Sequence, residues 1–386
     1  MRRLALLGLL YFGACNSGSA KPQDRPPAPR DATTADADPS KLQGAALYQT
    51  FCSQCHGADA KGYKADNAPS LVNKTFLESA TDDFIARSIF AGRPGTSMAG
   101  YGKELGGPLD RAAIDRIVAF LRAQGPQAQP LGTAASTGVA ARAAENYEKL
   151  CKQCHGDAGT RGNTVHLANQ QFLSAASDAF IRYAIVNGRP GTPMEAFGKK
   201  LGAQEIDDLV AYVRALGAQQ HQQQTGLLPA PTGKEPVVIH PKGKDPVWKK
   251  LRTDPHTKEA RFVSVDEVNQ AYAQKRRMVI IDARPPSDWM RAHITGAVSI
   301  PYHDVARLAD LPKDVWAIAY CACPHHLSGI VVDELKKRGH KRALVLDEGV
   351  LEWHRRGYPM TTAPGVGPPP KEDHSGHDHS HHGHGH

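Results

Sequence analysis

The chain has 386 residues, a length typical of two or three globular domains. Its hydrophobic content of 40% is sufficient for ordinary cores. The net charge of +8 is compatible with nucleic acid, an anionic membrane surface or an acidic protein as a partner. The N-terminal segment indicates export, which excludes nucleic acid from these three.

Residues 1–15 are predicted to be a signal peptide. Arg2 and Arg3 precede an apolar run that is too short to span a bilayer permanently. The run ends in Phe-Gly-Ala-Cys, which resembles the lipobox of bacterial lipoproteins. The resemblance implies that Cys15 is lipidated and contacts the membrane; the alternative is an ordinary signal whose cleavage removes Cys15. We therefore expect a location in the periplasm or outer envelope.

Residues 16–40 are rich in Pro, Ala and Asp without periodicity, so we predict a disordered tether. No stretch after the signal is apolar enough to cross a membrane.

An internal repeat follows the tether. It consists of two pairs of matching segments: FCSQCHG at 51–57 with LCKQCHG at 150–156, and GRPGTSM at 92–98 with GRPGTPM at 188–194. The offset between the copies falls from 99 to 96, which places the length difference in a loop. The repeat predicts two domains with the same fold, at 41–125 and 141–217, and a linker at 126–140.

Each copy is predicted to be all-α. The last helix of each copy has apolar residues at helical spacing: Ile114, Ile117, Val118 and Leu121 in the first copy, and Ile206, Leu209, Val210 and Val213 in the second. Gly125 and Gly217 are expected to end these helices as left-handed caps.

The two C-x-x-C-H motifs are candidate covalent haem c sites. On one helical turn, two thiols and an imidazole face a single planar ligand, so the thiols form thioethers and the imidazole binds iron. The predicted cofactor-binding residues are Cys52, Cys55 and His56 in the first copy, and Cys151, Cys154 and His155 in the second. The alternatives are half of a zinc site or a redox C-x-x-C, but no second C-x-x-C lies within either copy.

Met98 and Met194 are the candidate sixth ligands of the two haem irons. The chain has only six Met, and these two stand at equivalent positions in a Gly/Pro-rich loop before the last helix. The alternative role is that of an apolar filler in the core. His/Met ligation raises the reduction potential relative to His/His and leaves no open iron position. It therefore favours electron transfer over oxygen chemistry.

Both copies resemble class I cytochrome c domains. The resemblance rests on the motifs above, on Gly44 and Tyr48 in the first helix, and on Phe120 and Tyr212 in the last. It implies that the carbonyl of Pro69 accepts a hydrogen bond from the proximal His. The second copy has Val165 there, and a backbone carbonyl does not require Pro.

Arg93 and Arg189 are candidate partners for haem propionates. The alternative role of each is that of a solvated loop residue.

Residues 262–361 are predicted to form an α/β domain with a parallel sheet, after a linker at 218–261. Short apolar runs at 278–281, 317–320 and 343–346 alternate with helical stretches at 265–275 and 327–338. These residues resemble the rhodanese family at Asp282, Arg284, His293, Ile294, Gly296 and Ala297, and in the closing GVLEWHRRGYP at 349–359.

The rhodanese resemblance implies that Cys321 is a persulfide-carrying catalytic Cys. The loop that follows lacks the family's Arg and carries Pro324, which removes one N–H donor. His325 and His326 are possible replacement cations, and Cys323 is a second candidate that could attack a Cys321 persulfide. The alternatives are an inactive sulfur-binding or interaction module and a soft-metal site made of Cys323, His325 and His326.

The segment 362–386 is predicted to be a His-rich tail, and its HDHSHHGHGH at 377–386 is able to bind zinc, nickel or copper. The leading functional hypothesis is a diheme electron carrier that exchanges electrons with redox partner proteins. One alternative is an enzyme that couples a sulfur-compound substrate at Cys321 to haem electron transfer. The other is an envelope-tethered sensor.

Overall fold

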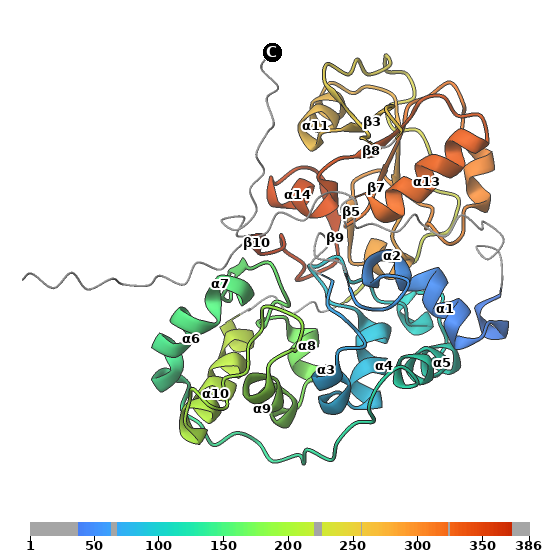
Figure 1. Ribbon diagram of the computed structural model, residues 1–386. Helices are drawn as coiled ribbons and strands as arrows, with labels where there is room; N and C mark the ends of the chain where they lie inside the picture. Colours follow the sequence, from blue (N-terminus) through green and yellow to red (C-terminus); the bar gives the residue numbers. More distant parts are fainter. Residues whose placement is uncertain (1–37, 63–67, 220–225, 256, 323–324, 373–386) are drawn as a thin grey trace, which may run out of the picture.

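The computed structural model describes residues 38–62, 68–219, 226–255, 257–322 and 325–372. Two helical domains carry the repeated sequence, and we call them the first and second repeat domains; an α/β domain follows them (Figure 1). This architecture confirms the predicted fold class of two all-α domains and an α/β domain with a mostly parallel sheet. The predicted signal peptide, Cys15 and the HDHSHHGHGH segment lie outside the described residues.

Short polar side chains begin the helices of the first repeat domain. The side chains of Asn73, Thr81 and Asp110 each accept a hydrogen bond from the backbone N–H three residues later, which satisfies a donor that the helix itself leaves unpaired. The elements are η3 (Pro39–Lys41), α1 (Gly44–Phe51), α2 (Ser53–His56), α3 (Lys74–Ser79), α4 (Asp82–Ala91), η5 (Lys103–Leu105) and α5 (Arg111–Arg122).

The second repeat domain has the same helix order and equivalent caps at Asn169 and Ser177. Its predicted linker at 126–140 ends in a segment that is bonded to the last helix: Ser136 and Thr137 donate to Asp207, and Val139 donates to Asp208. The elements are η6 (Ala140–Ala143), α6 (Ala144–Leu150), α7 (Lys152–His155), β1 (Thr160–Arg161), α8 (Gln170–Ala175), α9 (Asp178–Asn187) and α10 (Ala203–Gln219).

The expectation that Gly125 and Gly217 are left-handed caps is wrong. Neither glycine has a positive φ, and α10 continues through Gly217. Both are small because a Leu packs against them: a Cβ at Gly125 would lie 2.4 Å from Leu77 Cδ1, and one at Gly217 would lie 2.3 Å from Leu173 Cδ1. In both copies the glycine therefore lies where a Leu side chain packs closely against the backbone, and it does not form a turn.

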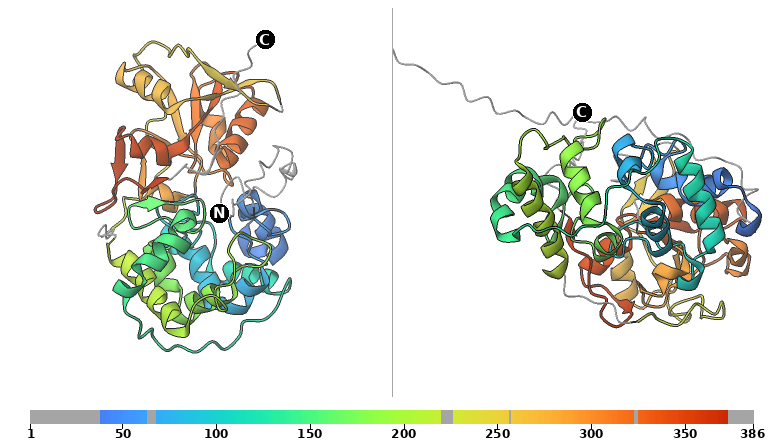
Figure 2. Two further views of the ribbon diagram at one scale, coloured as in Figure 1. Left: turned by 60° about the vertical axis from the view of Figure 1, so that its left-hand side comes forward. Right: turned by 90° about the horizontal axis from the view of Figure 1, so that it is seen from below.

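The two repeat domains pack against each other in a nearly reciprocal way (Figure 2). The Asn73 side chain donates to the Pro190 carbonyl at 2.8 Å, and its repeat equivalent Asn169 donates to the Pro94 carbonyl at 2.9 Å. Between these bonds, the equivalent rings of Phe84 and Phe180 stack at 4.6 Å. The Met-bearing loop of each domain is therefore held by the other domain.

The α/β domain is built on a six-stranded sheet in the order β2-β3-β8-β7-β4-β6. All neighbours are parallel except β2 and β3. A fully buried run such as β7 is typical of a parallel strand covered on both faces. The strands of this sheet are β2 (Leu251–Thr253), β3 (Ala260–Val263), β4 (Val279–Asp282), β6 (Val298–Ser299), β7 (Ala317–Tyr320) and β8 (Ala343–Leu346). Two further strands, β5 (Ala292–Ile294) and β9 (Met360–Thr362), form a separate antiparallel pair, and β10 (Lys371–Glu372) follows them in the chain.

Helices cover this sheet and link its strands: α11 (Val265–Ala273), α12 (Pro286–Trp289), η7 (Ala306–Asp310), α13 (His326–Lys337) and α14 (Gly349–Arg355). Two segments that were predicted to be linker or tail are part of the fold. Strand β2 lies within 218–261, and β10 pairs with β1 of the second repeat domain. Within the described ranges, no helix combines the length and apolar character needed to cross a bilayer.

Candidate functional site

The first C-x-x-C-H motif lies where α1 gives way to the single turn of α2. The N–H groups of Cys55 and His56 both bond to the Cys52 carbonyl, so the motif is one helical turn. The His56 side chain is 7% exposed, and its Nδ1 donates to the Pro69 carbonyl at 3.0 Å. This bond fixes the ring and leaves Nε2 as the nitrogen suited to bind a metal.

The second motif repeats this geometry at α7. The Nδ1 of His155 donates to the Val165 carbonyl at 2.8 Å, and the Thr164 hydroxyl lies 3.1 Å from the same nitrogen. The replacement of Pro by Val at this position therefore leaves the hydrogen bond intact. Burial lowers the pKa of His56 and of His155, which favours the neutral imidazole that iron requires.

The first thiol of each motif lacks the lowered pKa that activates a redox C-x-x-C pair. Burial raises the pKa of Cys52 to about 12 and that of Cys151 to about 11. Reactive C-x-x-C thiols have a lowered pKa, because the thiolate is the nucleophile. The motifs are better suited to thioether attachment than to dithiol chemistry.

Met98 and Met194 occupy loops with the same backbone bonds. The N–H of Arg93 bonds to the Met98 carbonyl at 2.7 Å, and the N–H of Arg189 bonds to the Met194 carbonyl at 2.8 Å. Each loop begins at a left-handed glycine, Gly92 in the first domain. The iron ligation itself stays a prediction for both Met residues.

Arg93 and Arg189 lie between the repeat domains and are not solvated loop residues. The Arg93 guanidinium lies 5.8 Å from the ring centres of Phe84 and Phe172, and burial lowers its pKa to about 10. Burial likewise lowers the pKa of Arg189 to about 10. Within the described ranges, neither guanidinium forms an ion pair. A half-buried cation without a carboxylate partner fits an acidic ligand, and haem propionates have this chemistry.

The donor set thus fits haem c. Each domain supplies two thiols and one oriented imidazole on a single turn, together with a half-buried Arg in the Met-bearing loop. Among the described residues, no group of three His, Cys, Asp or Glu side chains could hold a metal ion. The zinc alternative would need such a group. The Cys323–His325–His326 alternative stays untested, because Cys323 and Pro324 lie outside the described residues.

In the α/β domain, the predicted family residues form a buried structural network. Arg284 donates to both carboxylate oxygens of Asp282 at 2.9 and 2.7 Å and to the Ala292 carbonyl at 2.7 Å. Tyr320 donates to the same Asp282 carboxylate at 2.8 Å. Gly296 has a φ of +82°, which favours glycine. This network connects β4 to β5 and to the last residue of β7, directly before Cys321.

Cys321 lies at the end of β7, as the sequence predicted. It is 1% exposed, and its Sγ lies 3.3 Å from the Ser328 hydroxyl. His325 does not face it as a free cation, because its Nε2 bonds to Asp347 at 2.7 Å. His326 turns toward the first repeat domain, where its Nδ1 lies 3.9 Å from Cys55 Sγ.

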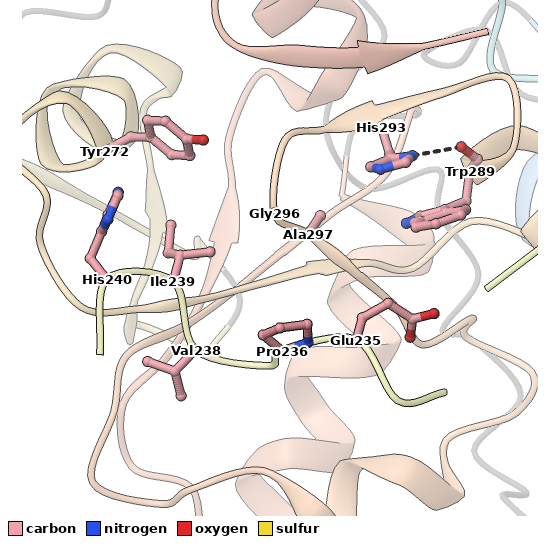
Figure 3. A pocket seen from close by; sticks show the side chains of 10 residues that line it. All are labelled: Glu235, Pro236, Val238, Ile239, His240, Tyr272, Trp289, His293, Gly296 and Ala297. Carbon is pink, nitrogen blue, oxygen red and sulfur yellow. Dashed lines mark hydrogen bonds between the residues drawn. The ribbon is translucent and has the colours of Figure 1, made fainter. Parts of the chain in front are cut away.

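A separate open pocket of about 470 Å³ lies elsewhere on the α/β domain (Figure 3). The segment from Glu235 to His240 forms one side, and His293 and Trp289 lie on the other. Their rings stack at 3.8 Å, and the His293 Nδ1 donates to the Trp289 carbonyl. Neither Cys321 nor a C-x-x-C-H residue lines this pocket, so it is not part of the candidate redox sites.

Sequence reasoning missed two sets of residues. The first is the pair Arg122 and Arg214, whose guanidinium groups bond to the carbonyls of Leu77 and Leu173; the repeat itself carried the signal, because the two Arg are equivalent. The second is the contact of Ser97 with the Cys321 loop, for which the sequence offers no signal.

Comparisons with known proteins agree with this geometry. Residues 39–121 and 138–213 match the family model for cytochrome c oxidase, cbb3-type, subunit III. Residues 264–356 match the model for the rhodanese-like domain. The first family carries covalently bound haem c.

Among curated relatives, the chain is similar to the cbb3-type cytochrome c oxidase subunit FixP of Azorhizobium caulinodans, with 30% identity over 47% of this chain and 61% of that protein. It is also similar to subunit CcoP of Rubrivivax gelatinosus, with 30% identity over 46% of this chain and 56% of that protein. A sulfurtransferase of Allochromatium vinosum is 25% identical over 27% of this chain and 96% of its own length. The chain thus spans somewhat more than half of the two cytochrome relatives.

Proposed function

Since the chain contains cytochrome c domains of the cbb3 subunit III type followed by a rhodanese-like domain, we propose that it is an exported diheme electron carrier. The observation that carries the proposal is the duplicated site: each C-x-x-C-H turn presents a His whose Nδ1 is bonded to a carbonyl, at 3.0 Å for the buried His56 and 2.8 Å for the half-buried His155.

Each proposed haem is held by residues of a single repeat domain. Cys52 and Cys55 attach the first haem and Cys151 and Cys154 the second, while the two oriented imidazoles bind iron. Haem c supplies an iron that carries one electron. Met98 and Met194 would supply the remaining protein ligands of the two irons, which would leave no iron position open to oxygen and favour electron transfer.

The proposed setting is the bacterial envelope. The signal-like residues 1–15 support export to the periplasm or outer envelope, and lipidated Cys15 would add a membrane contact. The likeness to cbb3 oxidase subunits supports redox partners within a respiratory complex. The His-rich tail at 377–386 adds a candidate site for zinc, nickel or copper.

The test is maturation of the full chain in a host competent for cytochrome c assembly. The expected product is coloured, keeps its pigment during acid–ketone extraction and contains two haems per chain. Cys52→Ser and Cys151→Ser should each reduce the content by one haem. A colourless product, or one whose pigment is extracted, would overturn the proposal.

A second candidate function is sulfur oxidation at Cys321. One contact favours it: Ala322, the neighbour of Cys321, accepts a hydrogen bond from Ser97, the neighbour of Met98, at 2.9 Å. Incubation with thiosulfate or polysulfide should then reduce the haems, and Cys321→Ser should abolish the reduction. Absence of reduction with every sulfur donor excludes this function and leaves the carrier function intact.

A further inference from the structure

The α/β domain contacts the first repeat domain at two places that are both close to the proposed first haem. One is the attachment turn, where His326 Nδ1 lies 3.9 Å from Cys55 Sγ; in the mature protein this sulfur would be a thioether. The other is the Met98 loop, where Ser97 Oγ donates to the Ala322 carbonyl at 2.9 Å. Ala322 and His326 therefore contact both elements that would hold the first haem.

Contacts around this centre extend the interface. The Tyr302 hydroxyl lies 3.5 Å from the Tyr101 hydroxyl and 3.5 Å from the Phe51 carbonyl. Ser287 donates to the Gly100 carbonyl, and the His303 ring lies 5.5 Å from the Phe51 ring at a steep angle. In Figure 1, α2 accordingly lies at the boundary between the helical region and the α/β domain.

The equivalent surface of the second repeat domain is not covered in this way. Phe51 is 5% exposed, whereas its equivalent Leu150 is 41% exposed. Ser97 is half-buried and Gly100 is buried, whereas their equivalents Pro193 and Ala196 are exposed. The repeat thus provides an internal comparison: the same surface is an interface in one copy and faces solvent in the other.

From this asymmetry we infer that the rhodanese-like domain is the resident partner of the first haem alone. Ala322, next to Cys321, contacts the Met98 loop, and His326 lies against the attachment turn. As a result, the first haem responds to the chemical state of Cys321, the second haem does not, and Cys321 is reached from solvent only when the two domains separate. The inference rests on the proposed function only in taking the C-x-x-C-H turns as haem sites.

Alkylation of Cys321 tests the interface without measuring electron transport. In the full chain carrying Cys323→Ser, N-ethylmaleimide labelling of the peptide that contains Cys321 is followed by mass spectrometry. Ser97→Glu places a carboxylate against the Ala322 carbonyl, so the labelling rate should rise about tenfold. The matched control Pro193→Glu, at the equivalent position of the second copy, should leave the rate unchanged.

The haem response is measured by redox titration of the labelled and unlabelled protein. Labelling of Cys321 should shift one midpoint potential, and that potential should be the one that Met98→His also changes. A shift of the potential that Met194→His changes would overturn the inference. So would equal labelling rates in the parent and in Ser97→Glu.

A second variant separates a misfolded product from an informative one. Ser287→Glu introduces the charge from the α/β side of the interface, opposite Gly100, and should raise labelling in the same way. If both variants bind two haems and neither raises labelling, the inference is wrong. A variant that lacks haem when the parent binds two is misfolded and is replaced by the other variant, whereas a parent chain without haem would refute the proposed function, so the two failures are distinguishable.

Discussion

Each predicted iron-binding imidazole is positioned by one backbone carbonyl. Because His56 and His155 donate Nδ1–H to Pro69 and Val165, the tautomer and ring orientation are set before iron binds. The residue type at the accepting position does not matter, since only the carbonyl takes part. This explains how the second copy tolerates Val in place of Pro.

A prediction at the residue scale concerns the sixth ligand. Met194→His should lower the midpoint potential of one haem, because His/His ligation has a lower potential than His/Met ligation. The other potential should stay in place, and Met98→His should lower that one instead. Redox titration of both variants checks this, and an unchanged titration curve for Met194→His would show that Met194 is not a ligand.

A second prediction at this scale concerns a buried guanidinium. Arg122 is 6% exposed and donates to the Leu77 carbonyl at 2.6 Å and to Asp82 at 2.6 Å. Arg122→Met keeps the apolar stem but leaves the buried Leu77 carbonyl without its donor, while the exposed Asp82 carboxylate is solvated. The variant should therefore lower the free energy of unfolding of the first repeat domain by ~1–3 kcal/mol.

The equivalent Arg214 gives the matched control. Arg214→Met should lower the stability of the second repeat domain instead, since Arg214 donates to the Leu173 carbonyl at 2.5 Å. Urea unfolding monitored by haem absorbance measures both effects. If the free energy of unfolding falls by less than ~1 kcal/mol in each variant, the carbonyls must find another donor when the Arg is replaced, and the argument is contradicted.

At the scale of elements, the segment before the second repeat domain is tied down by two neighbouring carboxylates of α10. Asp207 accepts from Ser136 and Thr137, and Asp208 accepts from Val139 and Arg142. The composition of 126–140 had predicted a plain linker. Ser, Thr and Gly are common both in linkers and in segments that bind carboxylates, so composition alone does not distinguish the two.

A pH dependence follows from Asp207. Burial alone would raise its pKa, but hydrogen bonds from Ser136 and Arg182 outweigh burial and lower it to about 2. This value lies below the ~3.9 of an unfolded Asp. The stabilisation is therefore complete above pH ~4 and is lost as the pH falls from ~4 toward ~2.

Asp207→Asn isolates this contribution. The variant should melt at a lower temperature than the parent at pH 6, and the difference should shrink as the pH falls through 4 toward 2. Thermal unfolding at a series of pH values measures it. A difference that is constant down to pH 2 would show that the carboxylate charge is not responsible.

At the scale of the whole molecule, aromatic rings join the two repeat domains. Phe84 and Phe180 stack at 4.6 Å, and Phe76 and Phe172 pack around them edge-on. A double-mutant cycle of Phe84→Leu and Phe180→Leu should give a coupling of ~0.5–1.5 kcal/mol in the free energy of unfolding. Urea titrations of the four proteins measure the coupling, and strictly additive effects would mean that the rings do not stabilise the pair of domains.

Much of the α/β domain could be located from the sequence because its signals are local. The apolar runs at 317–320 and 343–346 became β7 and β8 with the expected bounds. The missed strand β2 has polar residues at two of its three positions and is mostly exposed. Among the described residues it pairs with β3 at the edge of the sheet, so it lacked the apolar pattern that marks a buried strand.

The sequence by itself determined the fold class and the chemistry that each motif can perform. Spacing within one turn sets which side chains face a common ligand, and the repeat sets the number of domains. Only the tertiary structure decided that Ala322, next to Cys321, contacts the first candidate haem site, and that the equivalent surface of the second repeat domain is exposed. That choice depends on single contacts such as Ser97 with Ala322, which lie 225 residues apart and follow no periodic pattern.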